Sequence, residues 1–249
     1  MNGPQILWVI PVLGGIRITQ TTLTSWIAMA LIILISFLVT RHLSVEKPGR
    51  VQIVVEKLVG MLYDMVESTM GKHNSFMAPY IGTLMLSSVF GSLLGMTYVL
   101  RSATADLSTT LAWALATTFL VWFFSIKNNG FFGWLKGFTE PVVVMTPMNI
   151  ISEIANPISM SFRHFGNIAG GMVLTTLVYS GLATASAFLL HWIPNALINS
   201  IPILQVGIPA VLSIYFDLFS SGIQALIFAM LTMIYIAGAN PPPEPEESV

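Results

Sequence analysis

The sequence predicts an all-α polytopic membrane protein with about five membrane-crossing helices and one amphipathic surface helix. First, its 249 residues are 55% hydrophobic and only 8% charged, whereas a soluble domain is typically about 25% charged. Second, the apolar runs are long and unbroken, unlike the short alternating segments of a membrane β-barrel. Third, one segment combines mixed charges with apolar side chains at helical spacing, a pattern typical of helices on a membrane surface.

The composition excludes several functional classes. The formal net charge is −1 and no basic stripe is present, so nucleic acid is not an expected partner. The absence of cysteine excludes disulfides, thiolate metal sites and cysteine nucleophiles. Neither a His-Glu-x-x-His motif, nor a Gly-x-Ser-x-Gly motif, nor a phosphate-binding glycine loop with lysine occurs. We therefore expect no metal and no cofactor.

The first part of the chain is predicted to cross the membrane once. Residues 1–22 form a short, mildly apolar lead outside the membrane. Leu23–Thr40 follows, and with its flanks it supplies the roughly 20 apolar residues that a crossing helix needs. In Ser44–Lys72, apolar side chains recur every three or four positions among charged ones. This spacing predicts an amphipathic surface helix over residues 44–73.

The middle of the chain is predicted to cross the membrane twice more, through Pro79–Leu100 and Leu107–Ile126. The first of these spans contains glycines that permit close contact between helices. The polar turn between the spans contains Asp106, which is either a plain cap for the next helix or a functional carboxylate. Lys127–Gly137 is predicted to be a loop with interfacial aromatic side chains.

Residues 140–239 are predicted to form a helical hairpin. One helical region runs from Pro141 to about Leu190, interrupted by two prolines, and the other spans Pro202–Ala239. Each is longer than a perpendicular crossing requires, and strong tilt accommodates the excess length. Residues 1–240 then form a single membrane domain, and the proline- and glutamate-rich tail, 241–249, is expected to be disordered.

Lysine and arginine predict the orientation in the membrane. The side with the amphipathic segment carries seven of these residues and the opposite side carries two. By the positive-inside rule, the N-terminus lies outside and the C-terminus lies in the cytoplasm. The seven are Arg41, Lys47, Arg50, Lys57, Lys72, Lys127 and Lys136, and the two are Arg17 and Arg101.

Arg163 is the most informative residue in the predicted hairpin. A guanidinium stays charged at any physiological pH, and placing it in hydrocarbon costs from a few to more than ten kcal/mol. Such a residue persists by facing water, a partner or a ligand, so it marks a functional site. The alternative is a helix that lies flat or in a soluble core, with Arg163 extending to solvent.

Polar residues share one face of the Arg163 helix. Their spacing of three, four or seven positions keeps them close to one line. Glu153 lies ten residues before Arg163, about 15 Å along a helix, so the two cannot pair directly. Asparagines in this line also suit hydrogen bonds between helices, which is the alternative interpretation. The members are Asn149, Glu153, Asn156, Arg163 and Asn167.

Three further features complete the candidate site. Gly166 and Gly170 have the spacing that lets another helix approach closely. Asp217 and Gln224 are seven residues apart and share a face of the last helix. Because burial disfavours a charged carboxylate, Asp217 suits a proton or cation relay, or else a protonated structural role. His164 faces about 100° away from Arg163 and is expected to pack or to line water.

The segment Asn156–Gly170 closely resembles subunit a of the rotary F-type ATP synthases, the stator of their membrane sector. Gln224–Phe228 is similar to the Gln-Ala-Phe-Ile-Phe segment of that family's last helix, and Thr104–Leu107 is similar to its loop signature. The resemblance covers nearly the whole chain after residue 20. The residues that match the arginine segment are Pro157, Ser159, Arg163, Phe165, Gly166, Asn167 and Gly170.

The resemblance implies a stator with two aqueous half-channels that carry H⁺ or Na⁺ to and from a ring of c subunits. Arg163 would attract each ring carboxylate in its ionised form, displace its ion and separate the half-channels. Gln224 would lie near Arg163 and help to hold it, and Asn167 would belong to the same ion path. Gly166 and Gly170 would face the ring.

The resemblance also implies a lining for each half-channel. Asp217 and Asp106 would line the outer one, and Asn149, Glu153 and Asn156 the inner one. The implied partners are the c-ring, the subunit b peripheral stalk, the other synthase subunits and the lipid bilayer of a bacterial plasma membrane. The nucleotide chemistry would belong to other subunits, so this chain would not be an enzyme.

Five positions depart from the family pattern. Met172 stands where relatives often carry glutamate or histidine, and Asn149 stands where many carry glutamate. His164 replaces the usual leucine, and Ser92 stands where asparagine is common. Asp217 occupies a position where others have glutamate or histidine. These departures concern the route of the half-channels and leave the central arginine in place.

Two other functions fit an intramembrane arginine. An independent secondary transporter would use Arg163 to bind an anion, but such folds usually contain internal repeats with broken helices, and no clear repeat is present. A membrane-embedded enzyme would need a nucleophile–base pair or a metal site, and neither pattern occurs in the sequence.

Overall fold

The computed structural model is predominantly helical and confirms the predicted class. It describes residues 5–11, 16–41, 43–95, 97, 100–190, 215 and 219–242. Five helical segments in these ranges are long and apolar enough to cross a membrane, as predicted. The helices are α1 (Gln20–Thr40), α2 (Arg50–Met70), α3 (Ala78–Gly95), α4 (Leu107–Gly137), α5 (Thr146–Leu190) and α8 (Ser221–Ala239), with the short 3-10 helices η1 (Lys72–Met77), η2 (Ala103–Ala105) and η3 (Val143–Met145).

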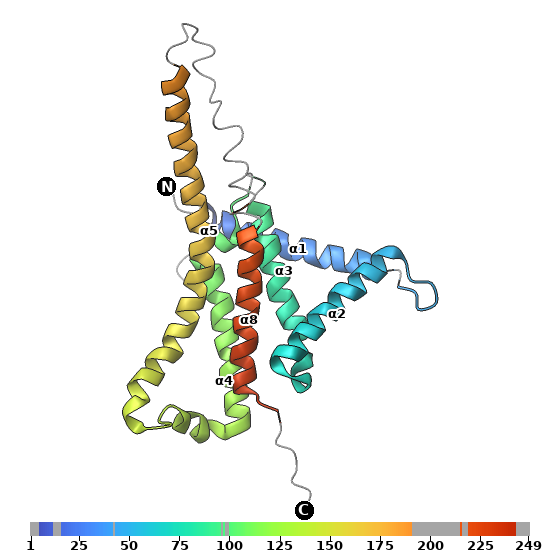
Figure 1. Cartoon of the computed structure of the whole chain (residues 1–249), viewed down its shortest axis with the longest axis vertical. Helices are drawn as coiled ribbons and strands as arrows, with labels where there is room; N and C mark the ends of the chain where they lie inside the picture. The colour runs from blue at the N-terminus through green and yellow to red at the C-terminus, as the bar shows by residue number, and fades with distance from the viewer. Residues whose placement is uncertain are drawn as a thin grey trace, which may run out of the picture.

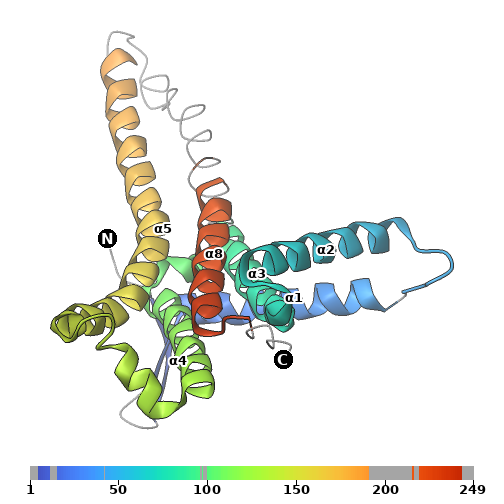
Figure 2. The same ribbon diagram turned by 60° about the horizontal axis from the view of Figure 1, so that its bottom comes forward.

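Helices α3, α4 and α8 form a central group, and α5 runs beside α4 and α8 and extends beyond them (Figure 1). Helices α1 and α2 project together to one side, and α1 runs across the direction of α5 and α8 in both views (Figure 2). The 45 residues of α5 span about 68 Å at 1.5 Å per residue. This is about twice the roughly 30 Å hydrocarbon thickness of a bilayer, so a strong tilt of α5 remains our prediction.

The apolar core lies where α2, α3, α4 and α8 meet. Met233 and Ile236 of α8 are fully buried there, together with Val66 of α2 and Ile81 of α3. By contrast, only 6% of the most apolar stretch of α5 is buried, compared with 44% for α8. Helix α5 therefore lies against the central group along one edge and keeps most of its surface open.

The predicted surface helix corresponds to α2 and is amphipathic as expected. Its last turns pack into the core, whereas Val51, Val54 and Leu58 are all more than half exposed. Gln52 fixes the preceding turn, because its side chain accepts a hydrogen bond from the Ser44 amide and donates one to the Ser44 carbonyl, each at 3.0 Å. An exposed apolar face on this helix suits contact with lipid or a partner helix.

The predicted lead over residues 1–22 contains two short strands that were not predicted from the sequence. Strands β1 (Ile6–Ile10) and β2 (Ile16–Thr19) pair in antiparallel register, with Val9 opposite Arg17. Helix α1 begins at Gln20, three residues earlier than predicted, and the Thr19 side chain caps it by accepting from the Thr22 amide. Both strands contain β-branched residues, which favour extended backbone: Ile6, Val9 and Ile10 in β1, and Ile16, Ile18 and Thr19 in β2.

The predicted loop over Lys127–Gly137 is also wrong, because α4 continues through it. Gly130 breaks the helix with φ 70° and ψ 166°, a backbone that glycine adopts without steric cost. The helical residues after Gly130 therefore run in a new direction toward α5 (Figure 1). The structure therefore has a break at one residue, Gly130, in place of the predicted loop.

Helix α5 begins later than predicted and is not interrupted. Pro147 lies in its first turn, where a missing amide donor does no harm. Pro157 lies inside the helix, which nevertheless continues on both sides of it. Three predictions fall outside the described residues: the turn His191–Ser200, the first part of the last helix with Asp217, and the tail from residue 243 onward.

Candidate functional site

The polar stripe of α5 carries an exposed arginine. Arg163 is exposed, and no hydrogen bond or ion pair joins its guanidinium to another residue in the described part of the chain. An added Cβ at Gly166 or Gly170 would meet nothing within 4 Å. The arginine and the two glycines therefore face open space beside α5, and a second helix could approach this surface closely.

Asn167 connects this exposed stripe to α8. Its Nδ2 donates a hydrogen bond of 2.6 Å to Oε1 of Gln224. The Gln224 side chain is only 2% exposed, so its amide would be poorly satisfied without this bond. The structure thus brings Gln224 to the arginine helix, but through Asn167, which lies one turn beyond Arg163, rather than by a direct contact with the guanidinium.

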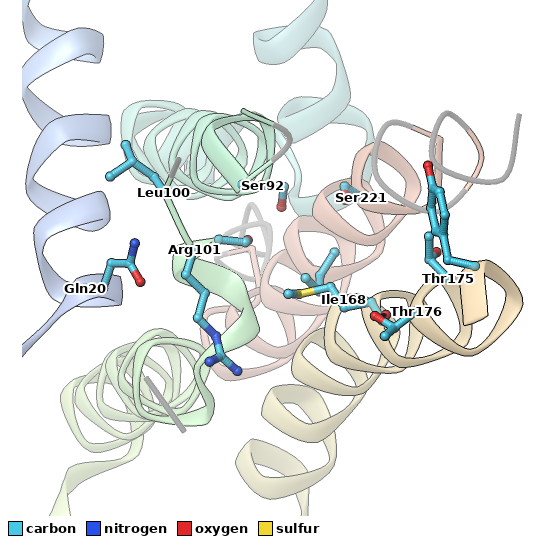
Figure 3. Close-up of a pocket in the computed structure, with 12 residues that line it drawn as sticks. Gln20, Ser92, Leu100, Arg101, Ile168, Thr175, Thr176 and Ser221 are labelled. Atoms are coloured by element: carbon cyan, nitrogen blue, oxygen red, sulfur yellow. Dashed lines mark hydrogen bonds between the residues drawn. The ribbon is translucent and has the colours of Figure 1, made fainter. Parts of the chain in front are cut away.

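A cavity of about 310 Å³ with both polar and apolar walls lies on one side of this position. Figure 3 shows that its walls come from α1 (Gln20), the α3–α4 connection (Arg101), α3 (Ser92), α5 (Ile168, Thr175, Thr176) and α8 (Ser221). The hydroxyls of Thr175 and Ser221 are buried without a hydrogen-bond partner in the residues described. Buried hydroxyls are normally hydrogen-bonded, so this cavity, which we call the outer cavity, suits water.

Two more cavities lie at the other end of the same helix group. The larger, about 350 Å³, lies between the second half of α4 and the start of α5, and the smaller, about 70 Å³, lies between α4, α5 and α8. Glu153 lines both of these inner cavities. The Trp122 indole nitrogen donates a hydrogen bond to its carboxylate. Glu153 is therefore held at the junction of the two spaces.

The comparison with known families decides the identity of the chain. Residues 22–237 match the sequence model of the family described as ATP synthase A chain. The chain belongs to this family. It is accordingly a multi-pass subunit of the ion-translocating membrane sector of an ATP synthase, in the stator, and it is not itself an enzyme.

Individual relatives agree with this family assignment. ATP synthase subunit a, sodium ion specific, of Propionigenium modestum is 31% identical, and the match covers 96% of this chain and 86% of the relative. ATP synthase subunit a of Desulforamulus reducens is 32% identical over 88% of this chain and 78% of the relative. ATP synthase subunit a 1 of Crocosphaera subtropica is 33% identical over 89% of this chain and 87% of the relative.

Asn149 and Asn156 on α5 line different inner cavities. Asn149 lines the larger inner cavity, and its Nδ2 also donates to the carbonyls of Phe138 and Glu140, at 2.8 and 3.0 Å. It therefore ties the corner after α4 to the start of α5. Asn156 lines the smaller inner cavity. The stripe predicted from spacing thus reaches from the inner cavities to Asn167.

Asp106 caps helix α4, which is one of the two roles that the sequence left open. It caps α4 by accepting from the amide and hydroxyl of Ser108, and it accepts a 2.6 Å bond from the Thr21 hydroxyl of α1. Burial acts to raise the pKa of its carboxyl, but these bonds and the charge of Arg101 outweigh it and lower the pKa below the usual value. It is not among the residues that line the outer cavity.

Sequence reasoning missed two residues of the site. Trp122 lies in the predicted span Leu107–Ile126, and nothing in its spacing predicts contact with Glu153 on another helix. Ser88 was not singled out, yet its hydroxyl lies 3.1 Å from Nε2 of His164. Both contacts join different helices, so only the packed structure reveals them.

Proposed function

We propose that this subunit provides two half-channels for H⁺ or Na⁺ and couples ion flow to rotation of a c-ring through Arg163. The observation that carries the proposal is the position of Arg163 on α5. The inner cavities extend along α5 as far as Met160, and the outer cavity begins at Ile168. Arg163 lies between these limits, exposed toward the space beside the helix.

The orientation follows from the positive-inside rule applied to this fold. The larger inner cavity lies among residues 121–153, near Lys127 and Lys136, and we assign it to the cytoplasmic side. The outer cavity includes Gln20 at the start of α1 and Arg101, and we assign it to the outer side. The N-terminus then lies outside and the C-terminus in the cytoplasm of a bacterium.

The exposed stripe is the surface that we assign to the c-ring. Each ring carboxylate that reaches Arg163 meets a fixed positive charge in a poorly solvated place. Two opposite charges 4 Å apart attract by about 4 kcal/mol at an effective dielectric of 20. That attraction favours the ionised carboxylate, so the bound H⁺ or Na⁺ leaves before the carboxylate passes. A carboxylate that moves on into hydrocarbon must first take up an ion from the other half-channel.

The same charge prevents a short circuit between the half-channels at the ring. A free cation that moved directly past Arg163 would meet a repulsive charge, so it crosses only when bound to the ring. A membrane potential supplies about 2.3 kcal/mol per charge per 100 mV, which is the energy that each bound ion delivers to rotation. Guanidinium suits this role better than an amine, because it does not lose its proton when buried.

The remaining residues support this ion path. Glu153, with Asn149 and Asn156, offers oxygen atoms along the inner cavities, and Asn167 with Gln224 fixes the stripe of α5 against α8. Asp106 supports the outer side by joining α1 to α4. Subunit b of the peripheral stalk and lipid are the proposed covers for the exposed faces of α1 and α2.

The experiment compares wild type with Arg163→Ala in inverted vesicles that contain the assembled complex. ATP-driven acidification and passive ion leak are measured with and without Na⁺. We expect the variant to assemble, to lose pumping and to leak, and a Na⁺ requirement in wild type would identify the ion. Full pumping by the variant would contradict the proposal, because Arg163 would then be a structural residue.

A further inference from the structure

On the buried side of α5, His164 lies midway between the inner and outer cavities. Met160 lines the smaller inner cavity, and Ile168 lines the outer cavity. His164 lies four residues from each, so the three share one face of the helix. Its side chain has no exposed surface. This imidazole therefore fills the space on the packed side of α5, about 100° around the helix from Arg163.

The other helices of the group place side chains at the same level. On α3, Ser92 lines the outer cavity, and Ser88, one turn further in, contacts Nε2 of His164 at 3.1 Å. On α8, Phe228 lies seven residues from Ser221 of the outer cavity and seven from Tyr235 of the smaller inner cavity. Ser88 on α3, His164 on α5 and Phe228 on α8 therefore lie in one layer between the outer cavity and the smaller inner cavity.

Three rings pack edge to face in this layer. The His164 ring centre lies 5.4 Å from that of Phe228 and 5.9 Å from that of Trp113 on α4, with interplanar angles of 83° in both pairs. Trp113 and Phe228 contact each other at 6.2 Å. Such mutual ring contacts leave little room for water. Ser88 closes the layer on the α3 side.

We propose that Ser88, Trp113, His164 and Phe228 form a septum inside the subunit that separates the two half-channels. This inference rests on the proposed function, since it takes the cavities to be half-channels. Arg163 closes the path at the surface of α5 that faces the ring, and the septum closes the path through the body of the subunit behind it. Without both barriers, ions would cross without turning the ring.

Shortening a septum side chain opens a route that water can enter. Phe→Ala removes the whole phenyl ring, and a buried water needs about 30 Å³ of space and two to four polar partners. His164 Nδ1 is buried without a hydrogen-bond partner among the described residues, and the hydroxyls of Ser88 and Thr117 are buried close by. The enlarged space is therefore polar enough to hold a water chain between the cavities.

The test measures passive ion flux in vesicles whose c-ring carboxylates have been blocked with a carbodiimide. A leak through the septum does not use the ring, so it persists after this treatment, whereas flux carried by the ring stops. We expect Phe228→Ala to raise the carbodiimide-resistant flux of H⁺ or of radiolabelled Na⁺ at least fivefold. Phe123→Ala is the matched control, because Phe123 on α4 is 59% exposed and lies outside the layer.

Two further variants keep the test decisive. His164→Leu keeps the layer filled, so its carbodiimide-resistant ion flux is expected to equal that of wild type. Trp113→Val opens the same layer from α4, and it replaces Phe228→Ala if that variant does not assemble. The septum proposal would be wrong if an assembled Phe228→Ala or Trp113→Val complex had the same carbodiimide-resistant flux as wild type. It would also be wrong if Phe123→Ala raised this flux equally. Absence of carbodiimide-sensitive, ATP-driven ion uptake in wild type would instead refute the proposed function itself.

Discussion

Arg163 and His164 are consecutive in the sequence, yet they occupy opposite surroundings. The guanidinium is exposed on the open face of α5, whereas the imidazole is completely buried against α3, α4 and α8. One residue of α-helix turns the chain by about 100°, which is enough to separate a partner surface from a packed interior. A single helix can therefore present a charge to a moving partner and close the space behind it.

The two faces also differ in the size of their side chains. The open face has Gly166 and Gly170 beside the arginine, where an added Cβ meets nothing within 4 Å. The buried face has Met160 and Ile168, which are 3% and 6% exposed, on either side of His164. Close approach of a partner needs small residues, whereas a barrier needs filled space, and α5 meets both needs within three turns.

Apart from the loss of Arg163 itself, the largest expected effect on this comparison comes from filling the open face. Gly170→Leu adds a bulky side chain where the c-ring is proposed to approach, at a position where an added Cβ meets nothing within 4 Å. We expect ATP-driven ion uptake in vesicles to fall at least tenfold. Gly60→Leu on α2 is the control, because its Cβ also meets nothing within 4 Å. Unchanged uptake by Gly170→Leu would place the ring on another face.

A smaller effect is expected at the inner end of the stripe. Glu153→Gln removes the charge that lines both inner cavities but keeps an oxygen that can accept from Trp122. We expect ATP-driven uptake to fall about fivefold with no added passive leak, since the septum is untouched. Glu46→Gln, in the exposed turn before α2, should have no effect. A leak in Glu153→Gln would show that this carboxylate acts as a barrier.

A still smaller effect on ion uptake is expected at Asn167, where the open face is joined to α8. Asn167→Ala leaves the buried Gln224 amide without its partner, which costs about 1–3 kcal/mol. We expect lower thermal stability in detergent and ion uptake reduced about threefold. The double variant Asn167→Ala, Gln224→Leu removes both polar groups and should recover stability but not uptake. Equal recovery of both quantities would mean that the pair has only a packing role.

The smallest effect is expected at Asp106, which belongs to neither face. Asp106→Ala removes the cap of α4 and the bond to Thr21, with a loss of about 1 kcal/mol typical for a helix cap. Because folding lowers the pKa of this carboxyl, its stabilisation is present at neutral pH and is lost as the pH falls below about 4. The difference in melting temperature between wild type and variant should therefore be smaller at pH 3 than at pH 7.

The sequence predicted the helical architecture because hydrophobic length and periodicity depend on local residues. The five crossing segments and the amphipathic α2 were predicted correctly for this reason. The predicted loop failed at Gly130, where one residue turns the helix, and the two short strands of the N-terminal lead were not predicted. Both are short features whose outcome depends on the neighbouring structure.

The candidate site was predicted only in part, for a similar reason. The spacing of Asn149 to Asn167 predicted one stripe, and the structure brings Asn167 to Gln224. Neither the contact of Trp122 with Glu153 nor that of Ser88 with His164 has a signature in the sequence, since each joins helices far apart in the chain. His164 was expected to pack or to line water, and its burial among aromatic rings decides for packing.

The most direct test places the same residue at the two consecutive positions. Arg163→Leu and His164→Leu are each assembled into the complete complex, and ATP-driven ion uptake is measured in inverted vesicles. The difference between the faces of α5 predicts that Arg163→Leu abolishes uptake, whereas His164→Leu keeps it within about twofold of wild type. Equal loss in both variants, or normal uptake by Arg163→Leu, would contradict the division of α5 into a ring-facing side and a sealing side.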